Sequence, residues 1–185
     1  FDQFFANDQR HVITVTDCAT GAPRYYEKND LGRRHFLRIL QAGCSLPLLQ
    51  KPVRFDGRLL MDGGIADPIP LGKSVADGNT RHVLILTQPR GYIKKPSPFA
   101  ALIRLRYGHY PALVHTFAHR HQRYNETMAR VDDLEQRSAI FTIRPKAPLA
   151  VGRAERNKDK LYAIYDVGYL DAAAHYDALK GYLDG

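Results

Sequence analysis

The chain has 185 residues, of which 44% are hydrophobic and 25% are charged. These proportions are those of a folded globular protein and exclude a disordered polypeptide. Lysine and arginine outnumber aspartate and glutamate by 27 to 19, and the net charge of +8 favours anionic partners such as nucleic acid or lipid headgroups.

The length predicts a single domain over residues 1–185, large enough for a central sheet covered by helices. The densest apolar run, residues 83–86, is far shorter than the roughly 18 to 20 residues that span a bilayer. We therefore expect a cytoplasmic or peripheral membrane protein. The chain begins at Phe1 without an initiator methionine, and we expect it to be part of a longer protein. Cys18 and Cys44 lack metal-ligand spacing and predict reduced, partly buried thiols.

The N-terminal part of the chain predicts two strands followed by a helix. Residues 10–16 are rich in β-branched side chains and predict a strand, and a turn then leads to a short return strand at Tyr25 and Tyr26. Helical periodicity begins at Asp30, a candidate N-cap. This helix should end near Gly43, since Pro47 follows.

The next segments predict a hairpin and then a parallel crossover. Asp56-Gly57 is a strong two-residue hairpin signal between residues 53–55 and 58–61. Residues 68–76 predict a helix entered through prolines, and residues 82–87 predict a buried strand. Strand, helix and strand in this order are typical of a parallel sheet in an α/β fold.

The C-terminal half predicts mainly helices. The expected elements are a basic loop over 90–98, helices over 99–137 with a break at Pro111, a strand over 139–143 and a helical tail from about residue 155.

The stretch from Leu59 to Gly78 carries the strongest candidate site. A short apolar segment runs into Asp62, Gly63 and Gly64, and a carboxylate at the carboxyl end of a strand lies where open α/β sheets place ligands and catalytic groups. The glycines leave room for close approach of other groups and permit positive φ. Such an aspartate could accept a proton from a serine; the alternative interpretation is a surface turn.

Other catalytic and binding patterns are absent or weak. The serine nucleophile elbow G-x-S-x-G does not occur, and its nearest approximation, around Ser45, has proline in place of the closing glycine. His115 and His119 are four residues apart but lack the glutamate of H-E-x-x-H, so we expect an exposed helix face rather than a metal site. No phosphate-binding glycine loop is present, and the basic residues are too scattered for a nucleic-acid surface.

With these motifs, the chain resembles the patatin-like phospholipases, specifically their bacterial branch. The resemblance is carried by Asp62-Gly63-Gly64-Ile65-Ala66-Asp67-Pro68-Ile69-Pro70-Leu71, which looks like the family's D-G-G/A motif with its downstream proline, and by the small-residue stretch Gln41–Pro47. Weaker similarity extends over most of the chain.

The resemblance implies an α/β fold, part of a patatin-like three-layer arrangement with a mostly parallel central sheet covered by helices. It implies a Ser-Asp dyad that cleaves acyl esters of lipids without histidine, metal or cofactor. Only Asp62 carries over as a catalytic residue, with Gly63 and Gly64 as motif support. The family's Gly-rich loop and G-x-S-x-G serine precede the matched region and are absent from this sequence, so we expect the chain alone to be inactive. It would be the C-terminal portion of the catalytic domain, with 97–185 as a candidate C-terminal extension.

Two functions remain in competition. The first is a serine acyl hydrolase of the phospholipase A or lipid esterase type, acting on a lipid or acyl-ester substrate. The second is a non-catalytic basic domain that docks on anionic lipid or on a protein partner; neither involves nucleic acid, and oligomeric state is left open. Asp67 is interpreted as an N-terminal cap of the helix entered at Pro68 rather than as a catalytic group.

Overall fold

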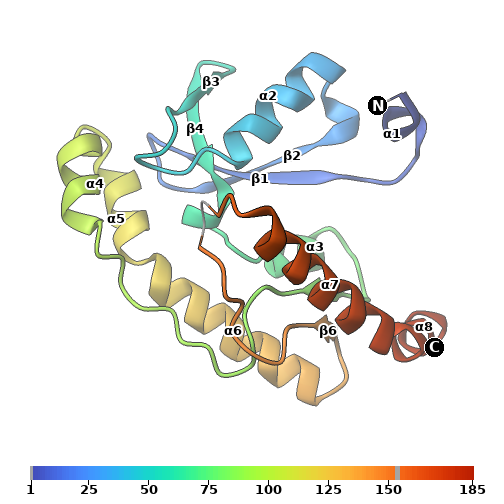
Figure 1. Ribbon diagram of the computed structural model, residues 1–185. Helices are drawn as coiled ribbons and strands as arrows, with labels where there is room; N and C mark the ends of the chain where they lie inside the picture. The colour runs from blue at the N-terminus through green and yellow to red at the C-terminus, as the bar shows by residue number, and fades with distance from the viewer. Residues whose placement is uncertain (1, 153–154) are drawn as a thin grey trace. The chain divides into compact units, whose positions relative to one another are not determined.

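The computed structural model describes residues 2–152 and 155–185, which divide into two compact units. One unit comprises Phe1–Pro70 and Lys94–Thr127, and the other comprises Leu71–Ile93 and Met128–Gly185. Figure 1 shows the order of helices and strands along the chain.

The first unit is built around a four-stranded sheet with the strand order β2-β1-β4-β3. The strands are β1 (Val12–Asp17), β2 (Pro23–Glu27), β3 (Val53–Phe55) and β4 (Arg58–Asp62). The helical segments are α1 (Asp2–Ala6), the 3₁₀ turn η1 (Lys28–Asp30), α2 (Arg33–Gly43), the 3₁₀ turn η2 (Gly63–Ile65), α4 (Ala100–Tyr107), α5 (Pro111–Ala118) and the beginning of α6 (Arg120–Gln136).

Every neighbouring pair of strands in this sheet is antiparallel. The prediction of a mostly parallel central sheet is therefore wrong for this unit. The reason is that short turns join β1 to β2 and β3 to β4, and such turns connect only antiparallel neighbours. The β3–β4 turn is the predicted one, with φ of 46° at Asp56 and 69° at Gly57, as a tight hairpin requires. The predicted strands of this region are confirmed.

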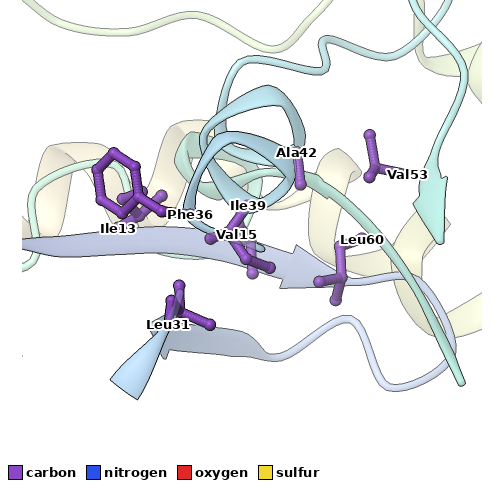
Figure 2. Packing of buried hydrophobic residues seen from close by; sticks show 8 residues of the cluster. All are labelled: Ile13, Val15, Leu31, Phe36, Ile39, Ala42, Val53 and Leu60. Carbon is purple, nitrogen blue, oxygen red and sulfur yellow. The ribbon is translucent and has the colours of Figure 1, made fainter. Parts of the chain in front are cut away.

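A hydrophobic cluster joins α2 to one face of the sheet. Its buried members come from both elements and from the segment before α2: Ile13, Val15, Leu31, Phe36, Ile39, Ala42, Val53 and Leu60. Figure 2 shows these side chains around α2 and the neighbouring strands. Burying a large aliphatic or aromatic side chain contributes about 1.5–3 kcal/mol, so this cluster fixes α2 against the sheet.

A second cluster covers the opposite face. It contains Cys18, Met61 and Ile65 together with Ile103 and Tyr107 of α4 and Leu113 of α5. Leu60 belongs to the first cluster and Met61 to the second, and successive side chains of a strand point to opposite faces. Helices therefore pack on both faces of this sheet, as the mixed α/β prediction requires.

Helix α2 begins later than its sequence pattern predicts. Its N-cap is Gly32, and Asp30 lies in the preceding 3₁₀ turn, so the prediction of Asp30 as the N-cap is wrong. Leu31, extended between the two helical segments, is buried in the first cluster, and its burial holds the chain out of helical geometry there. The predicted end at Gly43 is confirmed.

The second unit contains α3 (Leu71–Ala76), β5 (Val83–Ile85), β6 (Phe141–Ile143), α7 (Lys158–Ala174), α8 (Tyr176–Asp184) and the end of α6. Strand β5 pairs in parallel with β6 and not with β4, so the predicted parallel crossover from β4 through α3 to β5 is wrong. The prediction that β5 is buried is also wrong, because Ile85 is 78% exposed and only Leu84 is buried.

The predicted helical segments are otherwise confirmed, with small shifts at their ends. Helix α3 starts at Leu71 and not at Pro68, since Pro70 disfavours helical geometry at the residue before it. Residues 99–137 form α4, α5 and α6, with breaks before Pro111 and at His119. Among the helices described here, none is long and apolar enough to cross a membrane.

A buried carboxylate ties three strands of the sheet together. Asp17 ends β1 and is 1% exposed; its Oδ2 accepts hydrogen bonds from Arg24 Nε of β2 at 2.9 Å and from Arg58 Nη1 of β4 at 3.0 Å. Burial by itself would raise the pKa of Asp17, but the hydrogen bonds from both arginines and from the N–H groups of Ala19 and Thr20 outweigh it, and the pKa is lowered.

We predict that Asp17 makes the stability of this unit sensitive to acid. A carboxyl whose pKa is lower in the folded state adds stability above its unfolded pKa, near 3.9, and loses it as the pH falls through the folded value. The unfolding free energy of the wild type should therefore drop below about pH 4, and Asp17→Asn should be less stable at neutral pH and lack this component of the drop.

Denaturant unfolding measured across the acid range tests the prediction. Asp2→Asn is the matched control in the same unit, because Asp2 pairs with Arg33 on the exposed surface, where ion pairs contribute little. Equal acid sensitivity of Asp17→Asn and wild type would show that Asp17 is not a source of the acid sensitivity.

Candidate active site

Asp62 is the last residue of β4, where the sequence places it. Its Oδ1 accepts a hydrogen bond from Gly64 N–H at 2.7 Å and thereby caps the η2 turn. Its own N–H donates to the carbonyl of Ser45 at 3.1 Å. The carboxylate is partly exposed and held by the turn that follows it. Its position is therefore fixed by local backbone geometry as well as by the strand.

Thr16 of β1 joins the two ends of this turn. Its hydroxyl donates to the carbonyl oxygen of Asp62 at 2.8 Å and accepts from Ala66 N–H at 3.2 Å. The Thr16 side chain is fully buried. A single hydroxyl thus satisfies one backbone group on each side of η2. Sequence reasoning missed this role, because Thr16 lies 46 residues before its carbonyl partner and carries no local signal.

Gly63 is required for space, and neither Gly63 nor Gly64 adopts an unusual backbone angle. Gly63 and Gly64 are absent from the positive-φ residues of the described chain. A Cβ added to Gly63 would lie 2.3 Å from the carbonyl oxygen of Thr14, which is backbone and cannot move aside. At Gly64 it would lie 3.0 Å from Asp62 Oδ1 and 3.3 Å from Arg120 Nη2. The expected close approach is confirmed at Gly63, whereas the use of positive φ is not found.

Two arginines of α6 reach the same turn. Arg120 Nε donates to the carbonyl of Gly64, and Arg123 Nη2 donates to the carbonyl of Ile65 at 3.1 Å and to that of Thr116. Burial lowers the pKa of Arg123, against the charge of Glu126, which raises it. Sequence reasoning missed both side chains, since Arg120 is 56 residues from Gly64.

Asp67 is engaged elsewhere than predicted. Helix α3 starts at Leu71, so the interpretation of Asp67 as its N-cap is wrong. The Asp67 carboxylate instead accepts a hydrogen bond from the Tyr25 hydroxyl at 2.6 Å. Burial, this hydrogen bond and the charge of Asp67 raise the pKa of Tyr25. The pair joins β2 to the segment after the Asp62 turn.

The serine close to Asp62 in the fold has a structural role. Ser45 is 1% exposed, and its hydroxyl donates to the Gln41 carbonyl at 2.7 Å, within the last turn of α2. In the second unit, Ser74 Oγ lies 3.0 Å from His82 Nδ1 and also accepts from Asn79 at 3.2 Å. Ser74 lies inside α3 and not at a strand-to-helix turn, so it lacks the exposed geometry of a nucleophile elbow.

The histidine and cysteine positions do not form a ligand set. The rings of His115 and His119 lie 4.2 Å apart, and His119 Nδ1 is 2.8 Å from the His115 carbonyl at the end of α5. Within residues 2–152 and 155–185, no group of three or more His, Cys, Asp or Glu side chains is arranged for a metal ion. Cys18 is buried, which together with the charge of Asp17 raises its pKa to about 12, and Cys44 is exposed.

The site therefore consists of one carboxylate on a tightly supported turn. Gly64 N–H holds one carboxylate oxygen, Thr16 and Gly63 fix the turn against β1, and Arg120 holds it from the other side. Such a carboxylate can act as a general base toward a hydroxyl that is brought within hydrogen-bond reach.

Two family models match parts of the chain. Residues 3–73, which include Asp62, match the model described as patatin-like phospholipase, and residues 110–184 match a domain of unknown function, DUF6363. The uncharacterized protein YjjU of Escherichia coli (strain K12) is 26% identical over 130 residues, covering 69% of this chain. The chain spans 36% of the length of that relative. The region around Asp62 is therefore similar to a family of lipid hydrolases.

Proposed function

We propose that this chain supplies the aspartate of a Ser-Asp dyad in a patatin-like acyl hydrolase that acts on lipid esters. The observation that carries the proposal is the place of Asp62, at the end of β4 on a turn without room for a side chain at Gly63, within the segment similar to patatin-like phospholipases. The serine would come from the part of the longer protein that precedes this chain, and the two together would complete a patatin-like layered domain.

The proposed reaction has two halves. In the first, Asp62 accepts the proton of the serine hydroxyl as its oxygen attacks the ester carbonyl, and returns that proton to the departing alcohol, leaving an acyl-serine. In the second, Asp62 takes a proton from water as the water oxygen attacks the acyl-serine carbonyl, and it returns that proton to the serine oxygen as the ester bond breaks and the fatty acid is released. No metal or cofactor is needed for either half. Aspartate is a weak base, so close positioning must assist it.

The experiment compares the chain with the longer protein from which it comes. The longer protein is expected to contain a Gly-rich loop and a G-x-S-x-G serine and to hydrolyse a short-chain p-nitrophenyl ester, whereas the chain alone is expected to be inactive. A longer reading frame without both motifs would contradict the proposal.

A second proposal concerns how such an enzyme meets its substrate: helix α4 docks on an anionic lipid surface. Ile103 and Tyr107 bury one face of α4 in the second hydrophobic cluster. The opposite face exposes Leu105 (82%) and Leu102 (47%), next to Phe99 (58%) at the N-cap. Exposed apolar side chains on a helix face are typical of a membrane or protein contact.

Charge favours the lipid surface over a protein partner. Arg104 and Arg106 lie on the same short helix and are exposed, and the whole chain carries a charge of +8. Each basic residue near an anionic membrane contributes about 1 kcal/mol of attraction, and the leucines could then insert at the headgroup level.

Vesicle co-sedimentation tests this docking. The chain should bind vesicles of phosphatidylcholine with phosphatidylglycerol, and binding should weaken as salt rises from about 0.1 M to about 1 M, where screening shortens from about 10 Å to about 3 Å. Leu105→Asp should reduce binding several-fold, while the control Val75→Asp, which changes an exposed valine of α3, should not. Equal binding by wild type and Leu105→Asp would contradict the role of α4.

A further inference from the structure

The segment of unknown function begins inside the unit that carries Asp62. The DUF6363 match starts at residue 110, whereas the compact unit of Asp62 includes Lys94–Thr127. Helix α5 and the start of α6, residues 110–127, are called the positioning segment below. Its contacts with the Asp62 turn and with the sheet that carries this turn are of three independent kinds.

The first contact is apolar. Leu113 of the positioning segment packs in the cluster that contains Met61 and Ile65, the residues on either side of the Asp62–Gly64 turn. Tyr110, Val114 and Phe117 are partly buried against the same cluster. The residues at both ends of the turn therefore belong to the same buried cluster as α5.

The second contact is a close backbone approach. Gly21, in the turn between β1 and β2, has φ of 66°, and a Cβ on it would lie 2.5 Å from the carbonyl oxygen of Ala112 and 2.5 Å from Thr116 Oγ1. Only glycine fits such a position without displacing α5. The backbone of the β1–β2 turn therefore lies directly against α5, with no side chain between them at Gly21.

The third contact consists of charged hydrogen bonds to the turn itself. Arg120 Nε binds the Gly64 carbonyl, and Arg123 Nη2 binds the Ile65 carbonyl at 3.1 Å. The point where a Gly64 Cβ would lie is 3.0 Å from Asp62 Oδ1 and 3.3 Å from Arg120 Nη2, so the guanidinium and the carboxylate border the same small space. A cation that borders the same space as a carboxylate favours its ionised form, the form that accepts a proton.

We propose that residues 110–127 belong to the catalytic unit and that Arg120 and Arg123 are positioning residues that hold the Asp62 turn. This inference rests on the proposed Ser-Asp dyad for its catalytic consequence, while its structural part stands on the contacts alone. It gives a role to the start of a segment whose family has no assigned function: without it, two carbonyls of the turn lose their charged donors.

The first arm of the test uses the chain as given and needs no activity. Amide hydrogen exchange at Gly64 and Ala66 reports opening of the turn, whose N–H groups are bonded to Asp62 and Thr16. Arg120→Gln should speed this exchange roughly 10- to 100-fold, as loss of a charge-assisted hydrogen bond implies, and leave exchange at Leu60 unchanged. Arg120→Lys, which retains a charged donor, should restore most of the protection.

Arg130→Gln is the matched control, because Arg130 is an exposed residue of the same helix. Exchange at Gly64 that is equal in Arg120→Gln and Arg130→Gln would overturn the proposal. If Arg120→Gln does not fold, Arg123→Gln is used with the same expectation and the same contradicting result.

The second arm uses the longer protein with its serine. Arg120→Gln should lower kcat about 10- to 100-fold with little change in KM, and should move the acid limb of the pH–rate profile to higher pH, a shift that a merely structural role would not produce. An acid limb that stays at the same pH would overturn the claim that the charge of Arg120 favours the ionised form of Asp62. If the wild type does not hydrolyse esters, the proposed function fails, whereas the exchange result still decides whether the segment holds the turn.

Discussion

Replacing Asp62 by asparagine should lower kcat for a short-chain p-nitrophenyl ester by about 10²- to 10⁴-fold in the longer protein, the range expected for loss of a general base. The amide oxygen of asparagine can still accept the hydrogen bond that Asp62 Oδ1 receives from Gly64 N–H, so the turn should keep its shape. What is lost is the ability to take the serine proton.

Asp56→Asn is the control for this substitution. Asp56 is an exposed carboxylate in the hairpin just before β4, at a φ of 46° that asparagine tolerates well. Its activity should equal that of the wild type, and circular dichroism of both variants should be unchanged. Activity retained in Asp62→Asn would contradict the role of Asp62 as the general base of the dyad.

Replacing Gly63 by alanine should produce a large loss of stability in this unit from a single added methyl group. The new Cβ would lie 2.3 Å from the Thr14 carbonyl oxygen and 2.8 Å from the Thr14 Cβ, so β1 and the turn must separate. Overpacking of this kind costs up to about 3 kcal/mol. For a chain of this length that corresponds to a fall in Tm of about 6–12 °C.

Gly72→Ala is the control, and the Tm of both variants is measured by thermal denaturation. Gly72 lies in α3, and a Cβ there would meet no atom within 4 Å, so alanine should leave Tm unchanged or raise it slightly. A Tm of Gly63→Ala equal to that of Gly72→Ala would show that the turn does not need glycine at position 63.

The part of the site that could be predicted from sequence is the part built from neighbouring residues. Asp56-Gly57 predicts its hairpin because both residues favour the left-handed region, and the second arm of that hairpin carries Asp62 to the end of a strand. The resemblance to patatin-like phospholipases is carried by the same continuous stretch. Short-range chemistry is enough for these features.

The rest of the site depends on residues that are distant in sequence. Thr16 and Arg120 reach the turn from 46 and 56 residues away, and nothing in their local sequence distinguishes them from other threonines and arginines. The predicted crossover is wrong for a similar reason: the spacing of strand, helix and strand around α3 is compatible with one, but whether β5 pairs with β4 or with β6 depends on residues distant in sequence.

The central claim is that the Asp62 carboxylate is held where it can take a proton from a serine hydroxyl supplied by the longer protein. A crystal structure of that protein tests this most directly, through the distance between the Asp62 carboxylate oxygen and the Oγ of the G-x-S-x-G serine. We predict a hydrogen-bonding distance of about 2.6–3.2 Å, or slightly more without substrate. An Asp62 carboxylate directed into solvent, with no serine hydroxyl beside it, would contradict the account.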